Sequence, residues 1–208
     1  CSEALIEAGV ARVVYAVGDP DPRVDGGGAR RLSEAGVQVQ SGLLEDEAAE
    51  LNAGYLKRMR QGVPLVRLKL AMSLDGRTAL SDGRSQWLTG EAARLDVQQW
   101  RARSSALLTG IGTVLADDPK LSVRPPGPDV RQPLRVIFDS TLRMPPDARV
   151  FDGAGEGGVW IFTACEDRQR IAALTARGAR IEYAPGTAGT ESATRVDIAR
   201  VLAILGKS

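Results

Sequence analysis

Short apolar runs typical of β-strands alternate with helical patterns in the second half of the chain, and this alternation restricts the possible fold more than any other feature. One helix is expected to end near Arg177, and another is expected to begin at a capping residue, Asp197. Strands that alternate with helices predict a mostly parallel, layered α/β sheet. The expected strands are residues 105–111, 134–140, 158–164 and 180–184.

The first sixty residues predict a smaller α/β piece. Its expected elements are a helix at 2–9, a strand at 11–17, a helix at 29–36 and a strand at 37–42. A longer helix should follow, with apolar residues at i, i+4, i+7 and i+11 on one face, namely Leu44, Ala48, Leu51 and Tyr55. Residues 57–64 are expected to form a linker that begins as a basic, solvated helix end. We therefore divide the chain into domains of residues 1–60 and 61–208.

The second domain is expected to open with extended segments and a helix. Residues 65–73 alternate in hydrophobicity as a strand does, and residues 74–77 should turn the chain. Residues 78–86 are expected to return as a second, short extended segment. Thr89 can cap a helix that runs through Arg103. The buried stripe of this helix is expected to consist of Ala93, Val97 and Trp100.

Composition excludes several classes of site and partner. The 208-residue chain has no histidine, which removes His-based zinc sites, Ser-His-Asp triads and Cys-His pairs. Two cysteines do not make a disulfide framework, so a reduced, cytoplasmic setting is expected. A formal net charge of +1 gives no reason to expect nucleic acid or anionic lipid as a partner. No apolar run approaches the ~20 residues of a membrane span.

Polar side chains collect where the expected strands end. Open α/β sheets bind ligands outside the carboxyl ends of their strands, so these positions are candidate ligand contacts. Arg101 and Arg124 are candidate cations for a phosphate group. The polar positions at strand ends are Ser85, Trp87, Thr113, Asp117, Arg124, Asp139 and Ser140.

Simpler interpretations compete with a ligand site at several of these positions. The Gly-x-Gly at Gly110 and Gly112 lacks the third glycine of the dinucleotide fingerprint, so plain strand-end flexibility is favoured. Asp117 in "ADDPK" is, by spacing alone, more simply a turn residue. Lys69 is the odd residue of an apolar strand, and two alternatives stay open for it. Its ammonium either reaches water past a sheet edge or points into a cleft.

Four blocks of the sequence carry a resemblance to a known family. "LKLAMSLDGRTA", "SQWLTG", "RLDVQQWRARSSALLTGIGTVLADDPKLSVR" and "LRVIFDS" closely resemble the reductase domain of the bifunctional riboflavin biosynthesis deaminase/reductase. The stretch from Cys1 to Val39 is similar to the end of the deaminase domain of that family. The resemblance implies a dihydrofolate-reductase-like, mostly parallel α/β fold for residues 61–208. It implies the C-terminal part of a cytidine-deaminase-like domain for residues 1–60.

The resemblance also implies an activity and its residues. The family uses NADPH to reduce 5-amino-6-(5-phosphoribosylamino)uracil to the ribitylamino product, with hydride passing to C1 of the opened ribose. Lys69 matches a strand lysine of the active site. The positions that match the NADPH site are Ala71, Trp87, Thr113, Asp117 and Ser140. The positions that match contacts to the phosphoribosyl substrate are Ser85, Arg101, Leu121 and Arg124. Reductases of this kind commonly pair through the sheet, so a homo-oligomer is expected.

The resemblance implies zinc for the deaminase site of a complete protein only. Cys1 matches the last zinc cysteine of the family, whereas the His, the Glu and the other Cys of that site are not in this chain. The family also continues, after the point matching Ser208, into a strand and a glycine-rich loop. We therefore expect a fragment of the bifunctional enzyme. Two alternatives are a stand-alone reductase of the related diaminopyrimidine and a non-catalytic nucleotide-binding module.

Overall fold

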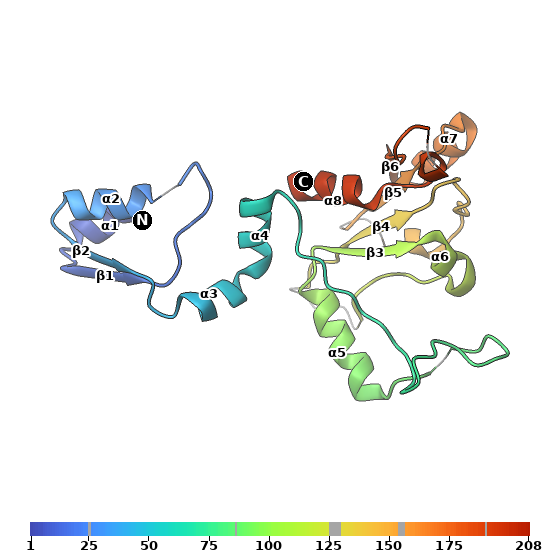
Figure 1. Ribbon diagram of the computed structural model, residues 1–208, viewed down its shortest axis with the longest axis horizontal. Helices are drawn as coiled ribbons and strands as arrows, with labels where there is room; N and C mark the ends of the chain where they lie inside the picture. Colours follow the sequence, from blue (N-terminus) through green and yellow to red (C-terminus); the bar gives the residue numbers. More distant parts are fainter. Residues whose placement is uncertain (25, 86, 125–129, 154–156, 190) are drawn as a thin grey trace. The chain divides into compact units, whose positions relative to one another are not determined.

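A computed structural model describes residues 1–208 except 25, 86, 125–129, 154–156 and 190 (Figure 1). The internal contacts divide the chain into two compact units. The first unit comprises Cys1–Arg67 together with Leu202–Ser208, and the second comprises Leu68–Val201. No helix in the described ranges is long and apolar enough to cross a membrane.

The second unit is built on a sheet of four parallel strands, as the alternating pattern predicted. Each strand pairs with the next one along the chain, so the order is β3-β4-β5-β6. The register places Leu108 opposite Val136, and Ile137 opposite Ile161. The strands are β3 (Ala106–Gly110), β4 (Leu134–Phe138), β5 (Val159–Thr163) and β6 (Ala179–Tyr183).

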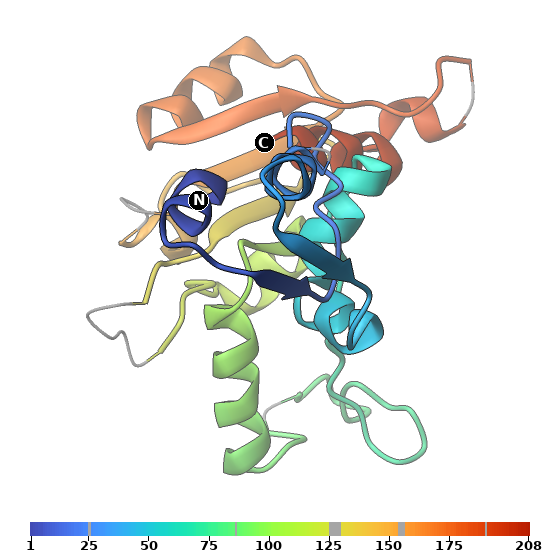
Figure 2. The same ribbon diagram turned by 90° about the vertical axis from the view of Figure 1, so that its left-hand side faces the viewer.

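The helices that lie between successive strands of this sheet help to bury its central strands. Ile137 and Ile161 of the two central strands are fully buried in the main core, together with Leu174 of α7 (Arg168–Ala176). Helix α7 lies beside β6, and its N-cap Asp167 accepts hydrogen bonds from the next turn (Figure 2). A short helix that the sequence did not predict, α6 (Ile111–Asp117), follows β3 directly and buries Ile111 and Val114. Two 3₁₀ helices complete the unit, η1 (Arg149–Phe151) and η2 (Glu191–Thr194).

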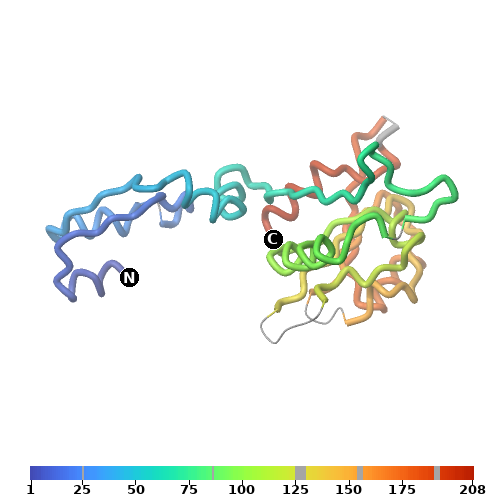
Figure 3. Tube along the Cα trace, turned by 90° about the horizontal axis from the view of Figure 1, so that it is seen from below, coloured from blue at the N-terminus to red at the C-terminus, as the bar shows by residue number. Residues whose placement is uncertain are grey.

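The strand expected at residues 65–73 does not form, so that prediction was wrong. Residues 64–73 are irregular (Figure 3), and the apolar side chains of Leu68, Leu70 and Met72 are exposed. An alternating pattern supplies suitable side chains, but a strand also needs a neighbour for its N–H and C=O groups. No strand of the described chain pairs with this segment.

The turn expected after this segment is present, whereas the extended segment expected next is replaced by a second turn. Ser73 and Arg77 close the expected turn through a hydrogen bond from Ser73 N–H to the Arg77 carbonyl, with Gly76 at a φ of +79°. Residues 80–84 form a second turn where an extended segment was expected, closed by Leu80 N–H on the Arg84 carbonyl. Gln86, the last residue of that expected segment, lies outside the described residues.

The helix expected after Thr89 is present as α5 (Glu91–Ala102), but two details differ. Its N-cap is Gly90 rather than Thr89. None of its residues is fully buried, and the expected stripe is wrong at two positions, because Ala93 is exposed and Trp100 is 37% exposed, while Val97 is partly buried. The Trp100 indole N–H donates to Asp96 one turn earlier, so the ring lies along the helix surface.

The first unit contains a two-stranded parallel sheet, with β1 paired to β2. Its four elements match the expected order: α1 (Ser2–Glu7), β1 (Arg12–Tyr15), α2 (Gly27–Glu34) and β2 (Gln38–Ser41). The longer helix expected after β2 is instead two helices that meet at Asn52, α3 (Glu45–Leu51) and α4 (Ala53–Gln61). The expected apolar face is therefore broken. Leu51 is 87% exposed, whereas Leu56 is buried.

The last helix, α8 (Ile198–Lys207), begins where the sequence predicted. Asp197 Oδ1 accepts the N–H of Arg200, as expected of a cap. Val201 is fully buried as expected, but Ile198 is exposed. In the first unit, the end of this helix meets α4, because Arg58 Nε donates to the Gly206 carbonyl at 2.9 Å. Arg58 therefore contacts a helix C-terminus and does not merely extend into solvent.

Candidate active site

Two arginines of the second unit meet at the loop of residues 121–124, and we call them the arginine pair. Arg101 comes from the last turn of α5, and Arg124 comes from the loop before β4. Burial, together with the positive charge of Arg124, lowers the pKa of Arg101. Arg101 Nη1 donates to the Ser122 carbonyl at 3.1 Å, so its guanidinium is directed at the loop that carries Arg124.

The loop of residues 121–124 is fixed by side-chain amides from two sides. Arg124 N–H donates to Gln98 Oε1 at 3.0 Å, and Val123 N–H donates to Gln132 Oε1 at 2.9 Å. The side chain of Leu121 belongs to the main core, and its φ of +48° turns the backbone sharply. These contacts define the position at which the Arg124 side chain leaves the loop.

The arginine pair offers a place for an anion. Within the described part of the chain, neither guanidinium forms an ion pair with a carboxylate. Two neighbouring cations repel each other, and an anion between them converts that repulsion into attraction. The planar, forked donors of arginine match the oxygens of a phosphate or carboxylate.

A second group of predicted residues lies at the carboxyl ends of the strands. Thr113 is exposed on α6, which begins directly after β3 ends at Gly110. Asp117 is exposed at the end of the same helix. Ser140 follows the end of β4 by two residues. Parallel sheets bind ligands at this edge, so these residues remain candidate ligand contacts.

The hydroxyl of Ser140 has a defined hydrogen-bond direction. Ser140 Oγ accepts the N–H of Val196 at 3.0 Å, and this contact uses one of its lone pairs. The Ser140 carbonyl accepts the N–H of Ala164 and the hydroxyl of Thr163. The hydroxyl proton of Ser140 can therefore be donated to an acceptor of a ligand, such as a phosphate or ribose oxygen.

The remaining predicted residues lie on the irregular segment before α5. Lys69 and Ser85 are exposed, and Ala71 is half-buried. Trp87 is 71% exposed, and the Arg94 guanidinium lies 4.8 Å from the centre of its ring. No hydrogen bond or ion pair among the described residues joins these four side chains to the arginine pair or to Ser140. The contacts that the structure shows therefore do not link these residues to those groups.

Cys1, the predicted zinc ligand, is exposed in the first unit. Where the structure describes the chain, no three His, Cys, Asp or Glu residues gather in a way that could hold a metal ion. Zinc needs three or four such donors, so the described residues do not fit this metal.

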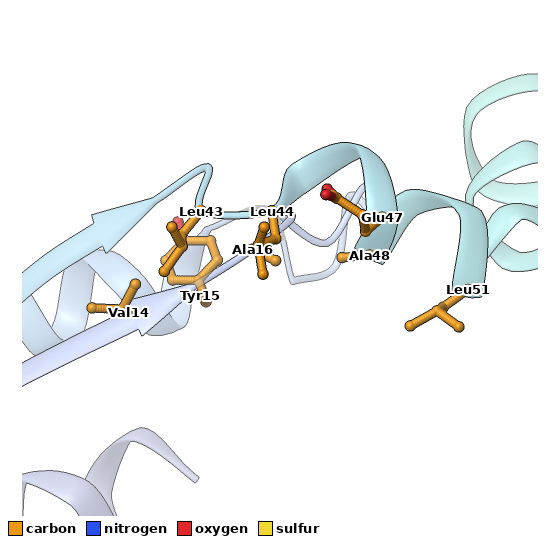
Figure 4. A pocket seen from close by; sticks show the side chains of 8 residues that line it. All are labelled: Val14, Tyr15, Ala16, Leu43, Leu44, Glu47, Ala48 and Leu51. Atoms are coloured by element: carbon orange, nitrogen blue, oxygen red, sulfur yellow. The ribbon is translucent and has the colours of Figure 1, made fainter.

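An open pocket of the first unit lies at the ends of β1 and β2 and beside α3 (Figure 4). Its lining is almost entirely apolar, and Glu47 and Tyr15 are the ionisable side chains among the residues that form it. Leu43 and Leu44 of this lining are largely exposed. The pocket holds none of the sequence-predicted site residues. Its lining is Val14, Tyr15, Ala16, Leu43, Leu44, Glu47, Ala48 and Leu51.

Sequence reasoning missed the residues that position the arginine pair. Gln98 lies three residues before Arg101 on α5, a spacing that puts both side chains on one helix face. That spacing was visible in the sequence, but the partner of Gln98 in the 121–124 loop was not. Nothing in the neighbouring sequence marks Gln132 or Ser122 as important. Each makes its hydrogen bond to a residue that becomes a neighbour only when the chain folds.

Comparison with known proteins agrees with the architecture of the second unit. The family model described as the RibD C-terminal domain matches residues 64–208. The riboflavin biosynthesis protein RibD of Escherichia coli (strain K12) is 49% identical over 178 residues, which cover 80% of this chain and 48% of that protein. The structure of Acinetobacter baumannii RibD, form 1, matches with a TM-score of 0.83 and 41% identity, over 100% of this chain and 54% of that one.

A third match is a solved structure whose name states two enzymatic activities. It is the structure of a diaminohydroxyphosphoribosylaminopyrimidine deaminase/5-amino-6-(5-phosphoribosylamino)uracil reductase from Thermotoga maritima, with a TM-score of 0.79, 30% identity and coverage of 100% of this chain and 54% of that one. The chain spans about half the length of the curated relatives it matches. The parallel α/β sheet and the family match agree over the same residues. The chain therefore belongs to the RibD family, and residues 64–208 carry its C-terminal domain.

Proposed function

We propose that this chain supplies the reductase site of a riboflavin-biosynthetic enzyme, which reduces 5-amino-6-(5-phosphoribosylamino)uracil to 5-amino-6-(5-phosphoribitylamino)uracil with NADPH. The observation that carries the proposal is the arginine pair. A partly buried guanidinium whose pKa is lowered by burial and also by a second guanidinium is a costly arrangement without an anion. The 5-phosphate of the ribosyl substrate is such an anion.

The arginine pair binds the substrate at a point remote from the carbon that is reduced. Arg101 and Arg124 contact the phosphate, and Ser85 and the backbone of Leu121 lie along the rest of the substrate. Binding at the phosphate restricts the motion of the ribose and orients its C1 atom. Binding the phosphate and orienting the ribose in this way requires no histidine, in agreement with the composition.

The carboxyl ends of β3 and β4 bind the dinucleotide. Ser140 donates its free hydroxyl proton to the cofactor, and Thr113 offers a second, exposed hydroxyl. Asp117 accepts hydrogen bonds from the cofactor, and Ala71 and Trp87 cover it. Bound NADPH supplies the hydride for the reduction. We assign Lys69, which is exposed on the irregular segment, a contact to the substrate.

Deamination belongs to the proposal only for a longer polypeptide of this family. Residues 1–60 then form the end of a deaminase domain, and Cys1 is one ligand of its zinc ion. Among the described residues, no three potential ligands gather to hold a metal ion, so no step of deamination is assigned to them. Deaminase activity with stoichiometric zinc in the purified 208-residue chain would contradict this assignment.

The test uses the protein expressed from the natural reading frame that contains these residues. NADPH consumption is followed at 340 nm with the ribosylaminouracil phosphate, and NADPH binding is measured separately by fluorescence. We expect substrate-dependent oxidation of NADPH, with NADH used at least about tenfold less well, which corresponds to about 1.4 kcal/mol.

Other outcomes separate the alternatives. Faster turnover with the corresponding diaminopyrimidine phosphate would assign the protein to the reductases that act before deamination. NADPH binding without any oxidation on either substrate would indicate a non-catalytic nucleotide-binding module. A protein that binds neither NADPH nor the substrate would overturn the proposed function.

A further inference from the structure

Asp139 is a fully buried carboxylate at the end of the central strand β4. Its Oδ2 accepts the N–H of Met144 at 2.8 Å. Its Oδ1 is equally buried and has no hydrogen-bond partner among the described residues. Burying a carboxylate is costly unless the carboxylate makes strong hydrogen bonds, so its retention beside Ser140 calls for a specific role.

The hydrogen bond to Met144 closes a turn of residues 139–144. Leu142 N–H donates to the Asp139 carbonyl at 3.2 Å within this turn. Leu142 has a φ of +53°, a left-handed conformation that is unfavourable for a residue of its size. From α7, Arg170 Nη1 donates to the Leu142 carbonyl at 2.7 Å. Asp139 and Arg170 therefore stabilise a strained turn from opposite ends.

The backbone of this turn carries Ser140, so the turn conformation contributes to the position of the Ser140 side chain. Ser140 is the second residue of the turn, and its carbonyl is fixed by Ala164 and Thr163 at the end of β5. Its Oγ is fixed by the N–H of Val196. The turn and these contacts place the Oγ atom, and the Val196 N–H occupies one of its lone pairs, so the hydroxyl proton is left for another acceptor.

We infer that Asp139 is a positioning residue for the dinucleotide, because its carboxylate holds the 139–144 turn in the conformation that directs the Ser140 hydroxyl at the cofactor. This inference rests on the proposed function in so far as Ser140 contacts the cofactor. Asp139 itself is too deeply buried to touch a ligand. Its contribution is to the affinity for NADPH and not to the chemical step.

Asp139→Ala removes the acceptor for Met144, whereas Asp139→Asn keeps an amide oxygen in its place. We expect Asp139→Ala to raise the KM and the Kd for NADPH about tenfold. The kcat at saturating NADPH and the KM for the ribosylaminouracil phosphate should stay within about twofold. Asp139→Asn should restore most of the NADPH affinity. Amide hydrogen exchange at Met144 should be fast in the alanine variant and protected in the asparagine variant.

Arg170→Ala is a second variant that acts on the same turn from the surface. It should raise the Kd for NADPH in the same direction, whereas Arg168→Ala, on the same helix and without a contact to the turn, should not. This pair keeps the test decisive if Asp139→Ala fails to fold.

The outcomes distinguish the inference from the proposed function. A wild-type protein that does not bind NADPH overturns the proposed function itself. Wild-type binding that is weakened by Ser140→Ala but not by Asp139→Ala or Arg170→Ala overturns the positioning role alone. Equal losses in kcat, in both KM values and in folding stability would show that Asp139 only stabilises the fold.

Discussion

Arg101 and Arg124 come from different elements, 23 positions apart in the sequence, yet the charge of Arg124 contributes to the lowered pKa of Arg101. Burial of Arg101 is the larger cause, and the two effects act in the same direction. An anion placed at the pair removes the repulsion and raises the pKa of Arg101 again. The pair is therefore the part of the site whose chemistry is most clearly defined.

Replacing Arg124 tests the phosphate site. Arg124→Ala should raise the KM for the ribosylaminouracil phosphate and lower kcat/KM by tenfold to a hundredfold, because a charge-assisted hydrogen bond contributes roughly 1.5–3 kcal/mol. Arg124→Lys should retain charge but lose the planar fork, and so raise KM by a smaller factor. The Kd for NADPH should not change. A loss of NADPH affinity with an unchanged substrate KM would show that the assignment is reversed.

Asp117→Ala should give the opposite pattern. Asp117 is exposed at the end of α6, so its removal should leave the fold intact. The Kd for NADPH should rise severalfold, and the KM for the substrate should stay constant. Steady-state kinetics and a fluorescence titration measure the two quantities separately. An unchanged Kd for NADPH would remove Asp117 from the cofactor site.

Gln98 should matter for substrate binding although it carries no charge. Gln98→Ala removes the acceptor for Arg124 N–H, so the 121–124 loop loses one of its attachments. We expect the substrate KM to rise about threefold to tenfold, which matches the loss of one neutral hydrogen bond of about 1 kcal/mol. Gln99→Ala is the matched control, because Gln99 is exposed on the same helix. Equal behaviour of the two variants would argue against the positioning role of Gln98.

The lowered pKa of Asp21 predicts that the stability of the first unit depends on pH. The residue is 5% exposed, and hydrogen bonds from the side chain and then the backbone of Arg23 lower its pKa from 3.8 to about 2. Because the folded-state pKa lies below the unfolded one, this contribution is complete above pH 3.8 and is lost as the pH falls towards about 2.

Carbon-13 NMR of the Asp21 carboxyl group measures this pKa directly. In Arg23→Ala the backbone hydrogen bond remains, so the pKa should rise only part of the way back to 3.8. The midpoint of acid unfolding should rise with it. Arg30→Ala removes the same charge from an exposed position and should leave Asp21 unaffected. A titration midpoint near 3.8 in the unmodified chain would contradict the Arg23 contact.

The backbone at Gly206 lies close to the backbone of Gly62 within the first unit. A Cβ atom at this position would overlap the carbonyl group of Gly62. Gly206→Ala should lower the free energy of unfolding by about 1–3 kcal/mol, the usual cost of overpacking. Gly54→Ala is the control, since a Cβ at Gly54 meets no atom within 4 Å. Urea denaturation compares the two variants, and an equal effect of both substitutions would contradict the contact.

Local sequence patterns were sufficient for the elements whose residues carry their own signal. The strands β3, β4, β5 and β6 are short apolar runs bounded by turn residues, and all of them form as predicted. The cap at Asp197 and the turn expected at 74–77 also depend on a few neighbouring residues, and both are present. In each case, the interactions that decide the structure lie within about one turn of chain.

Tertiary contacts decided the features that need a distant partner. Residues 65–73 have a strand pattern but no strand to pair with, so the pattern alone did not produce one. The expected helix from Leu44 to Tyr55 breaks at Asn52, and its Leu51 is exposed, because periodicity does not specify what a helix packs against. The sequence by itself determined the parallel sheet and named Arg101 and Arg124 as candidate cations. Only the fold made them a pair, because Gln98 and Ser122 meet their partners through hydrogen bonds that span more than 20 residues of the chain.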